Sequence, residues 1–165
     1  MWPSATRSPS WSVAEPRASR PASPDWLGGE EFLQWSWAVD RLTRERNYWV
    51  ASVRMDGRPQ SRPVWGVWSD DVLLLSVGEA GFRRARREPD GTIEVSVNVD
   101  SARDVVILEG AAGRTIDVSA EALAAYNRKY DWDLTAGMLN FVVRPRVVYG
   151  WRDEDVKTAT RWTFE

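Results

Sequence analysis

The chain has 165 residues, of which 43% are hydrophobic and 28% charged, and its net charge is −2. This length favours one domain with its own core, and no apolar run approaches the roughly 20 residues of a membrane-spanning helix. The chain contains no cysteine and no histidine. This composition excludes disulfides, thiol catalysis and the Ser-His-Asp triad, and leaves chemistry to carboxylates, arginines, hydroxyls, backbone amides or a cofactor.

The basic and aromatic residues are unusual. All but two of the 22 basic residues are arginine, and there are 11 tryptophans. A pI of about 5.4 argues against a general nucleic-acid binder. Arginine suits phosphates and carboxylates, although a GC-rich genome explains the bias equally well. Tryptophan is common where flat ligands or partner subunits dock.

Residues 1–25 are rich in Pro, Ser, Ala and Arg and lack the apolar stretch of a secretory signal. We therefore predict a disordered tail over residues 1–25 and a single domain over residues 26–165. Because cysteine is absent, we expect a cytoplasmic protein.

A helix is predicted next, over residues 30–46. Acidic Glu30 and Glu31 begin it and basic Arg44 and Arg46 end it, as the helix dipole favours. Its apolar stripe consists of Phe32, Trp35, Val39 and Leu42.

From residue 47 the hydrophobic period becomes that of strands, most clearly in the alternation of residues 92–100. The predicted strands cover residues 48–54, 60–68, 72–77, 92–100, 104–117, 141–151 and 156–164. A short helical segment is expected over residues 82–87. A longer helix is expected over residues 120–130, with Ser119 as its cap and Leu123, Tyr126 and Tyr130 inward. Short antiparallel strands at this spacing favour a mainly β fold, a closed or nearly closed barrel with flanking helices, over a sandwich.

The basic segment 82–87 carries the strongest local signal. It follows a glycine-rich turn at a predicted strand end, so backbone amides and a helix N-terminus would converge beside Arg83 and Arg84. This arrangement is typical of an anion site. A solvated basic helix face is an equally weighted alternative.

A second signal lies in residues 58–68. Pro63 inside a predicted strand belongs at an edge or a bulge, where it can aim Arg62 and Trp65 into a cleft. Alternatively, Trp65 and Trp68 are core residues on opposite faces. The acidic pairs fit turns better than a metal site, so we predict no metal.

In order and spacing, several segments resemble a known superfamily: residues 47–53, 56–59, 62–68, 83–86, 104–110 and 159–164. Residues 30–165 are similar to the pyridoxamine 5'-phosphate oxidase-like split β-barrels. Within these they most resemble the actinobacterial branch of flavin- and deazaflavin (F420)-dependent oxidoreductases.

The resemblance implies a homodimer of six-stranded antiparallel split β-barrels, FMN-binding-like, with two cofactor sites at the dimer interface. The cofactor phosphate is expected near Arg83 and Arg84, with Ser76 at the strand end. The implied ring contacts are Arg62, Pro63, Val64 and Trp65. A ring- or substrate-facing role is implied for Arg161 and Trp162.

Two departures from the family pattern bear on the cofactor. Phe82 takes the place of a common serine and Arg84 that of a lysine, and the segment from Arg87 to Gly91 is compressed and lacks the usual Asn-Leu. The Arg-x-x-x-Leu-Lys pattern of the FMN oxidases is absent, which favours F420 over FMN.

The expected function is hydride transfer between reduced F420 and a conjugated small molecule, with no nucleic-acid or membrane partner. Arg62 or Arg161 is a candidate for stabilising charge on a substrate oxygen. The alternatives are an FMN-dependent oxidase of the pyridoxamine-phosphate type and a non-catalytic binder of flavin, deazaflavin or haem.

Overall fold

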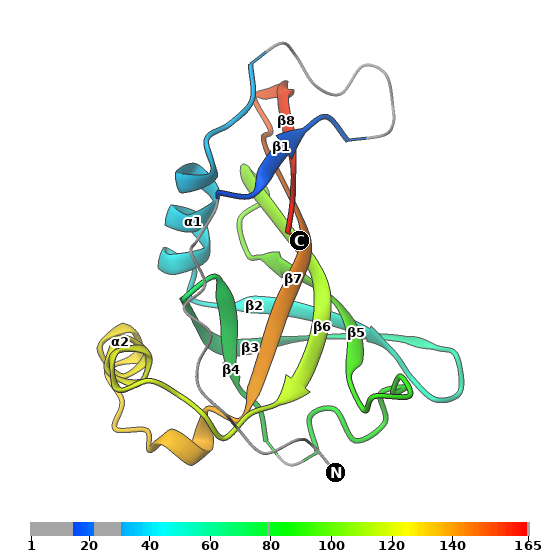
Figure 1. Cartoon of the computed structure of the whole chain (residues 1–165), viewed down its shortest axis with the longest axis vertical. Helices are drawn as coiled ribbons and strands as arrows, with labels where there is room; N and C mark the ends of the chain where they lie inside the picture. The colour runs from blue at the N-terminus through cyan, green and yellow to red at the C-terminus, as the bar shows by residue number, and fades with distance from the viewer. Residues whose placement is uncertain (1–14, 22–30, 79, 165) are drawn as a thin grey trace.

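The computed structural model describes residues 15–21, 31–78 and 80–164, and within them the chain forms a single eight-stranded sheet with two α-helices (Figure 1). The strands are β1 (Arg17–Ser19), β2 (Tyr48–Val53), β3 (Pro59–Ser69), β4 (Val72–Ser76), β5 (Ile93–Val99), β6 (Asp104–Arg114), β7 (Phe141–Arg152) and β8 (Asp155–Thr163). The helices are α1 (Trp35–Arg44), α2 (Ala120–Tyr130) and the short 3-10 helix η1 (Ala136–Met138).

Six of the strands close into a barrel. The sheet order is β1-β8-β7-β4-β3-β2-β5-β6, and β6 also pairs with β7, which completes the ring. One half of β7 pairs with β4, and its other half pairs with β8. The strands β8 and β1 therefore extend the sheet beyond the ring (Figure 1). The predicted mainly β, six-stranded split barrel is confirmed.

The expectation that acidic pairs lie in turns is confirmed for one pair, and the helix cap predicted at Ser119 is confirmed. Asp70 and Asp71 join β3 to β4 with φ values of 51° and 57°, the left-handed conformation of a two-residue hairpin turn. At the start of α2, the Ser119 hydroxyl accepts a hydrogen bond from the Ala122 amide at 3.1 Å.

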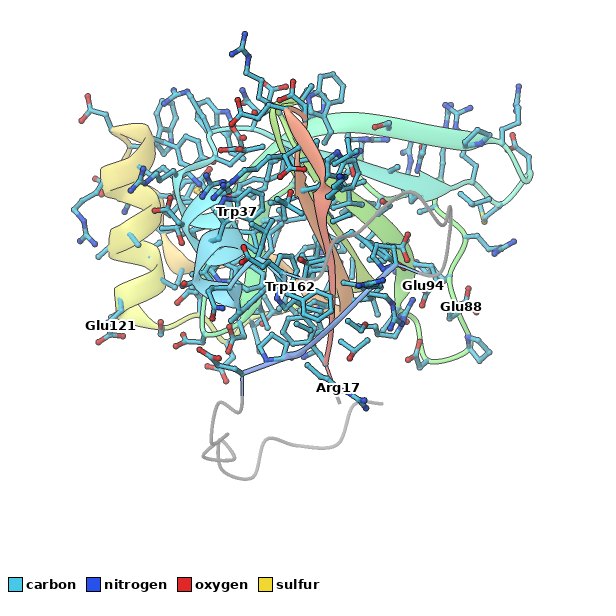
Figure 2. The ribbon with its side chains drawn as sticks, turned by 90° about the horizontal axis from the view of Figure 1, so that it is seen from above. Arg17, Trp37, Glu88, Glu94, Glu121 and Trp162 are labelled. Atoms are coloured by element: carbon cyan, nitrogen blue, oxygen red, sulfur yellow. The ribbon has the colours of Figure 1, made fainter. Side chains whose placement is uncertain are left out.

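The core has two parts. The larger part fills the barrel and the space beneath α1; there Trp162 is only 1% exposed and its ring centroid lies 5.5 Å from that of Trp35. Figure 2 shows Trp162 deep among the side chains, whereas Glu121 lies on the outer side of α2. The smaller part lies between α2 and the outer faces of β3, β4 and β7, and includes Val67, Leu74 and Tyr126. The helix α2 thus covers the barrel from outside.

The predicted helix over residues 30–46 is too long. Helix α1 begins at Trp35 and has no acidic residue in its first turn, so the placement of Glu31 there is wrong; residue 30 lies outside the described part. Leu33 is tied to the barrel instead, because its amide donates to the Thr160 hydroxyl at 2.9 Å. Helix α1 also ends before Arg46, and Phe32 is 40% exposed rather than part of the buried stripe.

The predicted tail is wrong for three of its residues. Arg17–Ser19 form β1, which pairs antiparallel with β8. Residues 1–14 and 22–25 of the predicted tail lie outside the described residues. Among the helices that the structure does describe, none is long and apolar enough to cross a membrane.

Segment 82–87 is not a helix. It runs past the end of β2, where the Met55 amide donates to the Arg84 carbonyl at 3.0 Å and the Arg86 amide to the Val53 carbonyl at 2.7 Å. These backbone groups pair with a strand, so they are not available for a helix. Phe82 and Ala85 anchor the segment by lying in the barrel core.

Candidate functional site

The split in the barrel lies along one half of β3. Residues 65–69 of β3 pair with β4, whereas residues 59–64 pair with β2 and have no β4 partner on their other edge. Pro59 and Pro63 occupy this half. Because proline has no amide hydrogen, an edge without a strand partner is where a sheet tolerates it. The edge position predicted from Pro63 is confirmed.

The main pocket opens beside this edge and has a volume of about 590 Å³. That is within the range of ligand sites. Its wall is formed by Asn47, Arg62, Pro63, Val64, Trp65, Ser76, Val77, Gly78, Ala80, Gly81 and Tyr126. The lining is mostly uncharged, which suits a flat, neutral ligand.

The loop after β4 is held in place by one carboxamide. The Asn140 side chain accepts from the Val77 amide at 3.1 Å and donates to the Val77 carbonyl at 2.8 Å. The loop then turns so that the Gly81 amide donates to the Gly78 carbonyl at 2.7 Å. Asn140, which directly precedes β7, therefore fixes the start of the loop that forms one wall of the main pocket.

Aromatic rings form another part of the pocket wall, to which Trp65 and Tyr126 contribute. Trp65 stacks on Tyr130, with ring centroids 4.6 Å apart and an interplanar angle of 13°. The Arg46 guanidinium lies 5.6 Å from the Trp65 ring centroid. Tyr126 lines the pocket, and burial raises the pKa of its hydroxyl further above its usual value near 10. This wall offers π faces and a neutral hydroxyl.

A lysine lies behind the aromatic wall and ties α2 to the barrel. Lys129 Nζ donates to the Tyr48 hydroxyl at 2.7 Å and to the Gly66 carbonyl at 3.1 Å. Burial lowers the pKa of Lys129 to about 8, against the opposing influence of Glu45. Lys129 therefore holds α2 on the barrel and lines neither pocket.

An arginine pocket of about 220 Å³ adjoins the main pocket, and the two share Arg62 and Ala80. Its lining consists of Arg54, Gln60, Arg62, Ala80, Arg83 and Arg84. No acidic residue is among these, and within the described ranges none of the four arginines forms a salt bridge. The arginine pocket therefore keeps its positive charge for a ligand.

Most of the expected site residues come together. Arg62, Pro63, Val64, Trp65 and Ser76 line the main pocket, and Arg62, Arg83 and Arg84 line the arginine pocket. Phe82 departs from the family pattern without obstructing either pocket, because it packs against Phe141 in the core with ring centroids 4.9 Å apart.

Arg161 and Trp162 lie elsewhere. Both belong to β8, which pairs with β1 and β7 and lines neither pocket. Trp162 is buried against Trp35, and a Cβ added at Gly150 would lie 2.8 Å from its ring. Trp162 therefore fills the core against α1.

Sequence reasoning missed several lining residues, notably Asn47, Arg54, Gln60 and Tyr126. The signal for Arg54 and Gln60 was present. Even-numbered residues share one face of the β2–β3 ladder, and this face changes from apolar at Tyr48 and Val50 to polar at Ser52 and Arg54. This change to polar residues at the end of the strand was the signal for Arg54 and Gln60.

Solved structures share this fold. No family model matches the sequence, and no curated protein is significantly similar to it. A FAD-binding protein from Mesorhizobium loti is 18% identical with a TM-score of 0.51, and the match covers 80% of this chain and 96% of that one. HupZ from group A Streptococcus is 14% identical with a TM-score of 0.51 and coverages of 73% and 96%.

An F420 reductase is 24% identical with a TM-score of 0.49, over 66% of this chain and 93% of that one. At that TM-score the likeness supports no argument. At these identities the matches with TM-scores above 0.5 show a shared fold, and they do not show a shared function. The chain has the fold of the split β-barrel proteins.

Proposed function

We propose that the chain is an oxidoreductase that binds a flavin-type cofactor across the two adjoining pockets. F420 is the cofactor that we favour. The flat ring would occupy the main pocket, and the phosphate of the tail would occupy the arginine pocket. One observation carries this proposal: a mostly uncharged pocket of about 590 Å³ shares Arg62 and Ala80 with a smaller pocket lined by four arginines. A molecule with a flat ring and an anionic tail has this same division.

The residues present fit such a group. When bound, the cofactor supplies the hydride, and the protein supplies binding, orientation and electrostatics. Trp65 and Pro63 present apolar surface to the ring, and Arg83 and Arg84 offer guanidinium forks to the phosphate. Arg62 lines both pockets, and its charge would stabilise negative charge that develops on an oxygen of a bound substrate. Hydride transfer from a cofactor needs no nucleophilic side chain, so it is compatible with a chain that lacks histidine and cysteine.

The substrate proposed for this site is a conjugated, electron-poor small molecule. The FAD-binding protein of the same fold supports a flavin-type ligand, and FMN is the alternative cofactor. An oxidase acting on a pyridoxamine-type vitamer and a non-catalytic carrier are the corresponding alternative functions.

The proposal includes a homodimer. The outer face of the β2–β3 ladder places Trp49 opposite Pro63, with Trp65 two residues further along β3. Trp49 is 40% exposed and Trp65 is 36% exposed. Exposed aromatic side chains of this kind support a protein interface beside the main pocket.

Titration with F420 and, separately, with FMN tests the binding part of the proposal. Because Trp65 lines the main pocket, a ligand ring in contact with it quenches tryptophan fluorescence in a saturable way. We expect the double variant Arg83→Ala/Arg84→Ala to weaken F420 binding at least tenfold, since each lost charge-assisted contact contributes more than about 1 kcal/mol.

The matched control is Arg86→Ala/Arg87→Ala. It removes the same two charges from the same segment, but neither residue lines a pocket. We expect its affinity to stay within about twofold of the wild type. Tight binding of FMN alone would move the assignment to the oxidase. Absence of binding by both cofactors at micromolar concentration would reject the proposed function.

A turnover assay separates an enzyme from a carrier. Reduced F420 is mixed with the protein and a panel of electron-poor conjugated compounds, and oxidation of the cofactor is followed. The proposal predicts oxidation that depends on both the protein and the compound. A protein that binds F420 and supports no oxidation with any member of the panel is better described as a carrier.

A further inference from the structure

Gln60 lies between two arginines of the arginine pocket. Its Oε1 accepts from Arg62 Nη2 at 3.2 Å and from Arg54 Nε at 3.4 Å. Its Nε2 donates to the hydroxyl of the buried Ser52 at 3.0 Å. A guanidinium only donates hydrogen bonds, so Oε1 is the atom of the amide that must face both arginines. Ser52 and the two arginines together fix the orientation of the amide.

The strand register explains this placement. Gln60 lies directly opposite Ser52 in the β2–β3 ladder, and Arg62 lies opposite Val50. Residues two apart on a strand point to the same face, so Gln60 and Arg62 share the inner face. Arg54 follows the end of β2 on that face as well. The ladder thus brings the two guanidiniums to one side chain.

The uncharged amide has an electrostatic consequence. A carboxylate at this position would hold both arginines equally well, but it would neutralise part of their charge and occupy their donors. The amide aligns them and leaves the positive charge intact. Arg54, Gln60 and Arg62 are half-buried, so this charge is less screened than that of the exposed Arg83 and Arg84.

We propose that Gln60 is a positioning residue that holds the guanidiniums of Arg54 and Arg62 ready to donate hydrogen bonds to an anion. The arginine pocket thereby selects ligands whose tail bears at least two negative charges. Both a phosphate monoester and a phosphate diester followed by a carboxylate have this chemistry. The inference rests on the proposed function for the identity of the ligand, but its physical basis is the arginine pocket alone.

Calorimetric titration with inorganic pyrophosphate tests the inference without any cofactor. We expect the wild type to bind pyrophosphate and Gln60→Glu to bind it at least tenfold more weakly, because the new carboxylate pairs with both arginines. In the wild type we also expect pyrophosphate to bind at least fivefold more tightly than the singly charged nitrate. For Gln60→Glu, the affinity should depend less steeply on salt concentration, since fewer charges are neutralised on binding.

Gln34→Glu is the matched control. Gln34 is exposed, precedes α1 and lines neither pocket, and its substitution changes the net charge by the same amount. We expect its pyrophosphate affinity to stay within twofold of the wild type. A second variant, Gln60→Met, removes the acceptor without adding charge and should weaken binding three- to fivefold. Thermal unfolding of each variant confirms that it is folded.

The outcomes separate this inference from the proposed function. Weaker pyrophosphate binding by Gln60→Glu alone supports the inference, even if F420 and FMN fail to bind. Equal binding by the wild type and Gln60→Glu overturns it, even if a cofactor binds. A wild type that does not bind pyrophosphate, or an equal loss in Gln34→Glu, also overturns it.

Discussion

Gly81 leaves room for the loop that forms one wall of the main pocket. A Cβ added to Gly81 would lie 1.9 Å from Val77 Cγ1, and Val77 is buried. Something must therefore move if a methyl group is introduced. We expect Gly81→Ala to lower the free energy of unfolding by about 1–3 kcal/mol and to weaken cofactor binding, measured by urea denaturation and by the fluorescence titration.

Gly78 provides the control for this prediction. It lines the same pocket, but a Cβ added there meets no atom within 4 Å. Gly78→Ala should therefore change the free energy of unfolding by less than about 0.5 kcal/mol. If the two variants were equally stable, the close contact of Gly81 with Val77 would not be a constraint on the fold.

Lys129 makes the stability of the protein depend on pH. Its pKa is lowered from 10.5 to about 8 in the folded chain. Between these values the unfolded chain binds a proton that the folded chain has lost, so the free energy of unfolding rises with pH. After allowing for partial exposure of the side chain, we expect a rise of about 1–2 kcal/mol between pH 7.5 and 9.5.

Lys129→Met isolates this contribution. The pKa of Tyr130 is raised to about 12 and that of Tyr48 is raised further above 10, both chiefly by burial, so these tyrosines lower the stability only above about pH 10. The variant keeps both tyrosines and lacks the titrating amine. As the pH rises from 7.5 to 9.5, the unfolding free energy of the wild type should increase relative to that of the variant. A difference that does not change with pH would refute the account of Lys129.

The sequence predicted the arginines of the site better than the groups that position them. Arg83 and Arg84 stand out because four arginines occur in a short segment after a glycine-rich turn. The polar face at the end of the strand indicates Gln60 only as a lining residue, because its role between the two arginines depends on the register that places it opposite Ser52. Trp162 shows the converse: its place in the sequence matches the family pattern, but packing against Trp35 decides what it does.

At the scale of elements, α2 positions part of the wall of the main pocket, and Ser119 caps its N-terminus. The Ser119 hydroxyl accepts from the Ala122 amide, which otherwise has no partner at the helix start. We expect Ser119→Ala to lower the free energy of unfolding by about 1 kcal/mol, measured by urea denaturation.

The effect of Ser119→Ala on binding should depend on the ligand. Helix α2 contributes Tyr126 to the main pocket and nothing to the arginine pocket. Fraying of α2 should therefore weaken binding of a cofactor ring more than binding of pyrophosphate. A variant that lost both equally would show that the two pockets are coupled through the fold.

The elements that were predicted well have strong local signals. The alternation in residues 93–99 and the cap at Ser119 depend on neighbours in the chain. The prediction of a helix over segment 82–87 is wrong: the composition permits one, but the Arg86 amide and the Arg84 carbonyl pair with the backbone at the end of β2. Helix α1 starts late because Leu33 bonds to Thr160, which is distant in sequence. Local patterns do not contain these long-range bonds.

At the scale of the whole molecule, the sequence predicts a barrel but does not predict which strands pair to close it. The spacing of the strands favours a barrel, but the pairing of β6 with β7 and the division of β7 between β4 and β8 follow from tertiary packing. The same division leaves half of β3 without a partner on one edge. The candidate site lies at that edge, so the topology that closes the barrel also creates the opening that holds the pockets.

The central claim is that one cofactor spans both pockets, and a crystal structure of the protein with bound F420 tests it most directly. The account predicts the ring against Pro63 and Trp65, the phosphate within hydrogen-bond distance of Arg83 or Arg84, and a second copy of the chain beside the site. If the ring lies elsewhere, or the phosphate lies outside the arginine pocket, the account is contradicted.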